Sequence, residues 1–209
     1  MKTLRIKLTF TEDCLGTASN NPELHSEYIA SKAPDAKSKA EEIEAIGTED
    51  YEEKQMTVFP RDEDGDPIMF DYQLRGFMKE ACSMLKRCPG EAHSKHSCKL
   101  KAYKKIIDGL IQATRKIKIH LGDSMGELQR PLRAQTAQGE RVALAHSETV
   151  PAGSYMEFEV TCMSDAFVEP VLEWLNYGKW HGLGQWRNAS WGRFTYEVLE
   201  MYDGEPRAA

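Results

Sequence analysis

Long apolar runs are absent from this 209-residue chain, which is 41% hydrophobic and 29% charged. No stretch approaches the roughly 18 consecutive apolar residues of a transmembrane helix, so we expect no membrane partner. The opening residues MKTLRIKL lack the apolar segment and cleavage site of a secretory signal peptide, and the cysteines number five, which is odd. Together these absences predict a cytoplasmic protein with reduced thiols, folded as a single domain over residues 1–209.

Recognisable catalytic motifs are missing as well. The chain has no GxSxG, HExxH or Walker loop. The acidic string RDEDGD at 61–66 lacks the ligand spacing of a calcium-binding EF-hand loop, so we interpret it as a plain turn. No enzyme class is indicated by these patterns, and we expect no catalytic residue.

The net charge of the whole chain is small, but acidic and basic residues are concentrated in different regions of the sequence. The formal net charge of −6 argues, taken alone, against a nucleic-acid partner. Residues 11–72 carry 5 Lys or Arg against 17 Asp or Glu, whereas residues 73–145 carry 15 against 6. One contiguous third of the chain is therefore as basic as many nucleic-acid-binding regions. The alternative explanation is a solvated face of amphipathic helices.

Hydrophobic periodicity predicts four core strands and two core helices. Alternation of apolar and polar residues over 2–11 predicts the first strand, and apolar stripes at helical spacing predict helices over 71–87 and 166–177. The remaining core strands are expected at 116–121, 155–163 and 193–202. The resulting order, βαββαβ, predicts an α+β protein with a ferredoxin-like core of the RRM type.

Two segments fall outside this predicted core. Residues 12–54, after the first strand, are acidic and include a short predicted helix over 37–47. Residues 122–154, rich in Gly, Gln, Arg and Thr, are expected to contain short extended pieces; that they form an inserted β-hairpin is an implication of the family resemblance that the following segments carry. A second basic helix is expected over 99–112, and the strands flanking the acidic turn, within 55–72, are expected to pair as a hairpin.

A loop rich in glycine, tryptophan and arginine, GKWHGLGQWRNASWGRF, occupies residues 178–194. Glycines let backbone N–H groups approach a phosphate, while Arg and Trp side chains neutralise charge and stack on bases. Here the sequence resembles the RAMP superfamily, the ferredoxin-fold proteins that build the RNA-binding backbone of CRISPR effector complexes. Their loop has the form GhG, a polar stretch with Arg or Lys, then GhG. The segments 182–184 and 187–194 are similar to it, although Phe194 stands at the final glycine position.

Two further segments are similar to the same family. FDYQLRGFMKEA at 70–81 resembles the start of the first RAMP helix, with Leu74, Arg75 and Gly76 in the matching positions. ERVALAHSETVPAGSYMEFEV at 140–160 resembles the segment before the third core strand, where a thumb hairpin returns to the core. The resemblance covers the first strand and most of residues 55–202.

This resemblance implies a non-catalytic protein that binds RNA or other single-stranded nucleic acid along its sheet and helix surface. It also implies assembly side by side on the strand, as a homo-oligomer or within a multi-subunit ribonucleoprotein, with each thumb reaching the next protomer. The nucleic-acid-binding residues that we predict on this basis are Arg75, Lys79, Arg130, Arg133, Arg141, Gly182, Gly184, Arg187, Trp191, Gly192 and Arg193.

A compact group of metal-ligating residues lies between the two basic helices. Cys88, His93, His96 and Cys98 provide two thiols and two imidazoles within 11 residues, a donor set that could hold structural zinc. Their order matches no common zinc module, and a polar loop with reduced thiols is the alternative. No other cofactor is expected.

Two other functions remain compatible with the sequence. A RAMP-like chain of phage or mobile-element origin, carrying the acidic segment 12–54, could cap or block a CRISPR-type complex by occupying a basic groove. An RNA endonuclease is the second alternative, with His25 or Asp35 as the residues to test.

Overall fold

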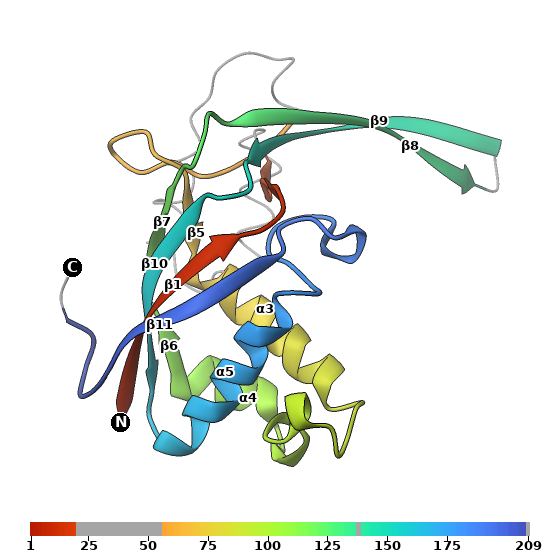
Figure 1. Cartoon of the computed structure of the whole chain (residues 1–209). Helices are drawn as coiled ribbons and strands as arrows, with labels where there is room; N and C mark the ends of the chain where they lie inside the picture. The colour runs from red at the N-terminus through yellow and green to blue at the C-terminus, as the bar shows by residue number, and fades with distance from the viewer. Residues whose placement is uncertain (20–55, 137–138, 208–209) are drawn as a thin grey trace.

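The computed structural model describes residues 1–19, 56–136 and 139–207. Within these ranges it describes the backbone of residues 131–144 but not their side chains. Within this part of the chain the fold is α+β, with two β-sheets and three α-helices (Figure 1). The predicted α+β class is therefore confirmed. No helix in the described part is long and apolar enough to cross a membrane. The predicted helix over 37–47, together with His25 and Asp35, lies outside the described residues.

The larger sheet is built on its first strand. In β1 (Lys2–Phe10), Leu4 and Ile6 are fully buried, so the predicted alternation is confirmed. Strand β1 lies between β11 (Phe194–Asp203) and β10 (Tyr155–Cys162), both antiparallel to it. The sheet order is β11-β1-β10-β7-β5, with β6 also paired to β10; these further strands are β7 (Lys116–His120), β5 (Ile68–Phe70) and β6 (Ile111–Ala113).

Helices α3 (Asp71–Leu85), α4 (Tyr103–Leu110) and α5 (Val168–Tyr177) lie on one side of the larger sheet (Figure 1). Their apolar stripes form the core against the sheet, because each helix has one face of apolar residues at helical spacing. Phe77 of α3 meets Phe194 of β11 edge to face, with ring centroids 5.1 Å apart, and Trp174 of α5 is fully buried. Four 3₁₀ turns complete this layer: η2 (Ala92–Ser94), η3 (Ser97–Lys99), η4 (Asp165–Phe167) and η5 (Arg187–Ala189).

The smaller sheet carries the predicted inserted hairpin. Strands β8 (Gly126–Thr136) and β9 (Gly139–Val150) pair antiparallel along their whole length and project beyond the core (Figure 1). The base of β9 also pairs antiparallel with β2 (Cys14–Leu15) and parallel with β4 (Thr57–Val58). Strand β4 in turn pairs antiparallel with β3 (Ala18–Ser19). The hairpin is therefore attached to the segment that follows β1.

Among the described residues, the predicted pairing within residues 55–72 forms only beside the turn. Arg61 and Pro67 form an isolated bridge, the Ile68 N–H donates to the Pro60 carbonyl, and the Asp62 N–H donates to the Asp66 carbonyl. Strands β4 and β5 themselves pair elsewhere, β4 in the smaller sheet and β5 in the larger one. The turn itself forms, since the Asp62 carboxylate accepts the backbone N–H groups of Asp64 and Asp66. Longer strands elsewhere provide more pairing surface than these two short segments provide for each other.

The helix predicted over 99–112 is shorter than expected. It begins at Tyr103 because Ala102 adopts a left-handed conformation, with φ of 51°. It ends at Leu110, and the β-branched Ile111 enters β6, where it pairs with Cys162 of β10. Edge pairing with the sheet therefore overrides helix propensity in the last predicted turn.

Candidate nucleic-acid interface

The glycine-rich loop between α5 and β11 has an unusual backbone. Gly184 and Gly192 have φ values of +81° and +67°, which favour glycine. Two residues that carry side chains also have positive φ, Trp186 at +50° and Ser190 at +75°. Such conformations cost about 1 kcal/mol or more each and persist where the surrounding structure enforces them. Their concentration in one loop marks it as a candidate functional element.

The glycines of this loop permit close backbone packing. A Cβ atom at Gly182 would lie 2.2 Å from the carbonyl carbon of Gly192, and one at Gly184 would lie 2.5 Å from the Leu15 carbonyl oxygen. The Gly192 N–H donates to the Asp13 carbonyl at 2.8 Å, and the Leu183 N–H donates to the Gly192 carbonyl at 2.9 Å. The loop is thus folded on itself and on the segment around β2, a constraint that the glycine spacing alone did not indicate.

Residues of the glycine loop, together with neighbouring residues, border a hollow of about 540 Å³. It is lined by Thr17, Glu80 and residues 184–188. Within the described residues, the backbone N–H groups of Gly184, Gln185 and Trp186 form no hydrogen bond. Consecutive unpaired N–H groups beside a guanidinium form the kind of concavity that binds anions. The hollow therefore has donors suited to a phosphate.

Glu80 of α3 links two cationic or ionisable groups beside this hollow. Its carboxylate pairs with the Arg187 guanidinium at 3.0 Å and lies 3.1 Å from His181 Nε2. His181 is 8% exposed, and its ring lies 5.7 Å from that of Tyr177. The pKa of Tyr177 is raised by burial first and by the Glu80 charge second. Sequence reasoning missed Glu80 and His181, because neither their spacing nor their local pattern brings them to Arg187.

Two predicted contacts on α3 are engaged in ion pairs. Arg75 pairs with Asp71 one turn earlier on the helix, and its Nε atom is buried without a hydrogen-bond partner among the described atoms. Lys79 pairs with Asp108 of α4. Both side chains are half-buried, as is Arg187, but Arg187 alone of the three lines the hollow.

The remaining predicted residues fall into two groups. Trp191 and Arg193 are half-buried at the end of the glycine loop, where the Arg193 carbonyl accepts the Thr11 N–H at 2.8 Å. Arg130 is exposed on β8. The backbones of Arg133 and Arg141 lie in the β8–β9 hairpin, and their side chains are not among those that the structure describes.

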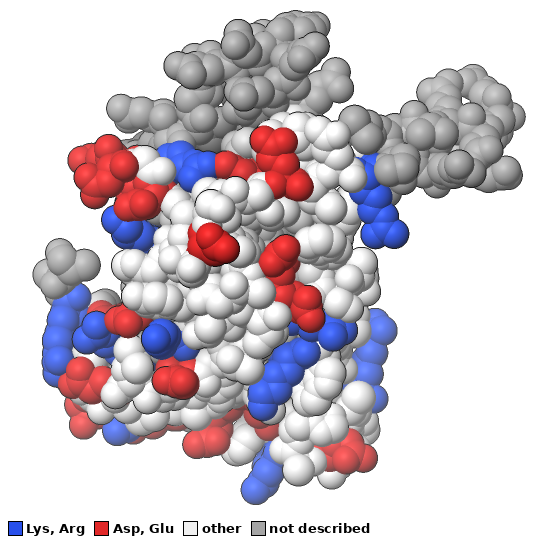
Figure 2. All heavy atoms as spheres, turned by 45° about the horizontal axis from the view of Figure 1, so that its top comes forward, with Lys and Arg blue, Asp and Glu red and all other residues white. Residues whose placement is uncertain are grey.

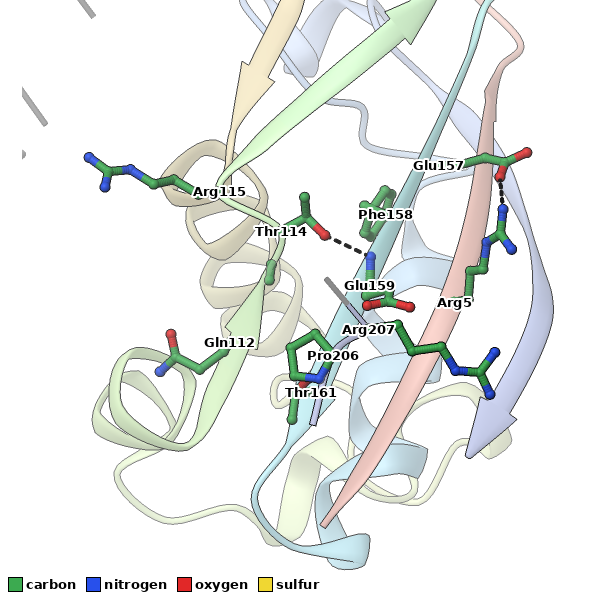
Figure 3. Close-up of a pocket in the computed structure, with 11 residues that line it drawn as sticks. Arg5, Gln112, Thr114, Arg115, Glu157, Phe158, Glu159, Thr161, Pro206 and Arg207 are labelled. Carbon is green, nitrogen blue, oxygen red and sulfur yellow. Dashed lines mark hydrogen bonds and ion pairs between the residues drawn. The ribbon is translucent and has the colours of Figure 1, made fainter. Parts of the chain in front are cut away.

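The open face of the larger sheet has a second hollow, of about 600 Å³ (Figure 3). It opens where β7 separates from β10, and the Thr114 hydroxyl accepts the Glu159 N–H across that gap. Arg5 pairs with Glu157 at 2.8 Å, as Figure 3 shows. Beside it, Arg207 pairs with the carboxylate of Glu200. Arg5 and Arg207 are thus neutralised by neighbouring acids, unlike the cations expected of an RNA platform.

The basic region of the sequence does not form one continuous basic surface on the face seen in Figure 2. Among the described residues of that view, Lys and Arg are interspersed with Asp and Glu. Lys118, for example, pairs with Asp66 and lies 3.7 Å from Asp62. The hydrogen bond that Lys118 donates to the Asp66 carboxylate raises the pKa of Lys118. Regional net charge therefore overstates how much basic surface this view offers.

The four residues predicted to hold zinc are not gathered in the structure. Within the described residues, only Asp62, Asp64 and Asp66 form a cluster of three or more possible metal ligands. The loop with the Cys and His residues is held by other contacts: the Glu173 carboxylate accepts the N–H groups of His96 and Ser97, at 2.7 and 2.8 Å. Zinc binding there stays a prediction that would require the loop to rearrange.

Thiol labelling should separate the cysteines into two classes. Burial raises the pKa of Cys82 and of Cys162 to about 11, and it raises that of Cys14 further. These three thiols stay protonated and enclosed near pH 7, so a maleimide should label exposed Cys88 first and half-buried Cys98 next. Mass spectrometry of labelled peptides, native against denatured, measures this order. Protection of Cys88 and Cys98 that a chelator relieves would instead demonstrate the zinc site.

The fold and the site together define an α+β protein with a glycine-loop hollow and a projecting hairpin. No family model matches the sequence, and no curated protein matches it. Among solved structures, the chain is similar to one in the cryo-EM structure of the Type III-B Cmr-beta bound to cognate target RNA. The TM-score is 0.50 at 9% identity, over 96% of this chain and 60% of the other. A chain of a Type IV-B CRISPR complex gives 0.48 at 12% identity, over 100% and 96%.

At 9% identity, the likeness to the Cmr-beta chain shows a shared fold. The chain spans 60% of that protein's length. The resemblance to CRISPR effector proteins that the sequence motifs indicated is thus confirmed at the level of the fold.

Proposed function

We propose that the chain binds single-stranded nucleic acid, RNA in particular, without cutting it, as a RAMP-type component of a CRISPR-like ribonucleoprotein. The observation that carries this proposal is the hollow of the glycine loop, where unpaired N–H groups of Gly184, Gln185 and Trp186 lie beside Arg187. Backbone donors of this kind bind phosphate oxygens without reading sequence.

The arrangement of the larger sheet supports a ferredoxin-like core. Its core elements follow one another along the chain as βαββαβ: β1, α3, β6 with β7, β10, α5 and β11. In space β1 and β10 are the central strands, flanked by β11 on one side and by β6 and β7 on the other. This order is the one expected when both helices cross over the same face of an antiparallel sheet.

A phosphate in the hollow would give Arg187 a second partner beside Glu80. In the unliganded protein the guanidinium pairs with Glu80, which also lies beside His181. Arginine can hold a carboxylate and a phosphate at the same time through different N–H groups, so Glu80 orients the side chain toward the ligand. Arg187 is therefore the residue on which binding should depend most.

Assembly along a strand is the second part of the proposal. The β8–β9 hairpin projects from the core and carries exposed Arg130, a form suited to reaching a neighbouring subunit and its RNA (Figure 1). The structurally similar Cmr-beta chain belongs to an assembly bound to target RNA. We infer a homo-oligomer or a multi-subunit ribonucleoprotein as the working form.

An Arg187→Ala variant should bind single-stranded RNA about 10-fold more weakly than the wild type. It should also reduce the slope of log affinity against log salt by about 0.7, because one phosphate contact is lost. Fluorescence anisotropy of a labelled oligonucleotide at several salt concentrations measures both quantities. In the same samples the RNA should remain intact, as gel electrophoresis would show.

Arg207→Ala is the matched control, because Arg207 pairs with Glu200 on the open sheet face, outside the glycine loop. Its affinity and salt slope should equal those of the wild type. Equal losses in both variants would point to a nonspecific charge effect and would contradict the proposed site.

A further inference from the structure

An exposed aromatic side chain lies at the start of the glycine loop, whose residues 184–188 line the hollow. Trp180 is 55% exposed, more than any other large apolar side chain in the described part of the chain. Its ring centroid lies 6.4 Å from that of His93 and 6.4 Å from that of Tyr177. The exposed indole offers an aromatic face with a polar N–H edge, which is available for stacking.

The segment next to Trp180 is strongly basic. Residues 86–105, which include His93, carry seven Lys or Arg and a single acid, Glu91. Six of these cations are exposed and form no ion pair within the described residues: Arg87, Lys95, Lys99, Lys101, Lys104 and Lys105. This absence of neutralising acids distinguishes these six cations from Arg5 and Arg207 on the open sheet face, which are paired.

A continuous line of contacts joins this basic segment to the hollow. Arg187 pairs with Glu80, and Glu80 lies beside His181. The His181 ring packs near Tyr177, whose ring in turn lies near Trp180. Trp180 then meets His93, at the edge of the basic segment.

We propose that Trp180 and His93 form a stacking step for an unpaired base, and that the cations of residues 86–105 bind the phosphates that follow. The proposal rests on the proposed function, since the same strand would pass from the hollow to this step. Exposed aromatic faces beside unpaired cations are the combination that binds single strands independently of sequence, because every base has a π-face. An acidic protein segment would use the cations but would leave the indole face without a partner.

The strand-length dependence of affinity tests this path. A Trp180→Ala variant should bind a long oligouridylate about 5- to 30-fold more weakly than the wild type, because one stacked base is lost. It should bind a short oligouridylate, long enough only for the hollow, with unchanged affinity. Trp180→Phe should restore most of the loss, since phenylalanine keeps an aromatic face. Met84→Ala, at an exposed apolar position on α3, should behave as wild type.

Tryptophan fluorescence provides a direct readout of the contact. Saturating long oligouridylate should quench part of the intrinsic emission, and this part should be missing in Trp180→Phe. If Arg187→Ala weakens binding while Trp180→Ala changes neither affinity nor quenching, the stacking step is refuted and the proposed function stands. If the wild type binds no oligouridylate of either length, the proposed function itself fails. A competition experiment can also overturn the proposal. It would do so if an oligoglutamate of equal charge, at equal concentration, displaced the long oligouridylate from Trp180.

Discussion

A Gly192→Ala variant should lose at least about 3 kcal/mol of folding free energy. The added Cβ atom would lie 2.0 Å from the Leu183 carbonyl oxygen, and the backbone φ of +67° disfavours any residue with a side chain. Because about 1 kcal/mol shifts the melting temperature of a chain of this size by roughly 2–4 °C, a fall of at least about 6 °C is expected. Differential scanning fluorimetry measures it.

Gly76→Ala is the control for this prediction. Gly76 lies within α3, and an added Cβ atom would meet nothing within 4 Å. Alanine has the higher helix propensity, so this variant should be more stable than the wild type by about 0.5–1 kcal/mol. Opposite signs for the two substitutions are the expected result, and a Gly192→Ala protein that melts at the wild-type temperature would be evidence against the described loop.

A Glu173→Ala variant should lose about 2–4 kcal/mol of folding free energy and loosen the loop after α3. The Glu173 carboxylate accepts the N–H of His96, the N–H of Ser97 and the Ser97 hydroxyl, and Ser97 is fully buried. Without the carboxylate, these donors lose their partner in a part-buried site, where the buried Ser97 has limited access to water. The same hydroxyl also accepts the Trp174 indole N–H at 3.0 Å, so the change reaches the core.

Hydrogen exchange locates this effect. The amides of His96 and Ser97 should exchange faster in Glu173→Ala, whereas those of β1 should change only with global stability. Glu169→Ala on the same helix is the control; Glu169 is exposed, and its loss should cost at most about 0.5 kcal/mol. Unchanged exchange at His96 in Glu173→Ala would show that something else, such as bound zinc, holds the loop.

The sequence predicted those elements whose periodicity reflects a single buried face. Strand β1 and helix α3 were located within one or two residues because Leu4 and Ile6, or Leu74 and Phe77, can face only one core. The pairing of Thr57–Val58 and Ile68–Phe70 was not predictable in the same way. Their partners, β9 and β7, are far along the chain, and local pattern contains no information about such pairing.

The candidate site also contains some residues that the sequence predicted and others that it did not. Motif spacing located the loop and Arg187, because the glycines and arginines are close in sequence. It could not locate Glu80, which lies on α3 and is far in sequence from His181 and Arg187, the two loop residues that its carboxylate contacts. It also assigned the glycines to phosphate approach, whereas the structure shows that Gly182 and Gly192 first permit backbone-to-backbone contact.

Strand β9 belongs to the projecting hairpin, yet its base holds the segment against which the glycine loop packs. Thr149 and Val150 pair with Leu15 and Cys14, and the Leu15 carbonyl lies where a Cβ atom of Gly184 would be. A shift at the base of the hairpin therefore changes the shape of the hollow. By thermodynamic linkage, a neighbour that shifts the hairpin and a strand that occupies the hollow must alter each other's affinity by the same factor. Cooperativity along an assembled filament would then originate within each subunit, in the two residue pairs between β2 and β9.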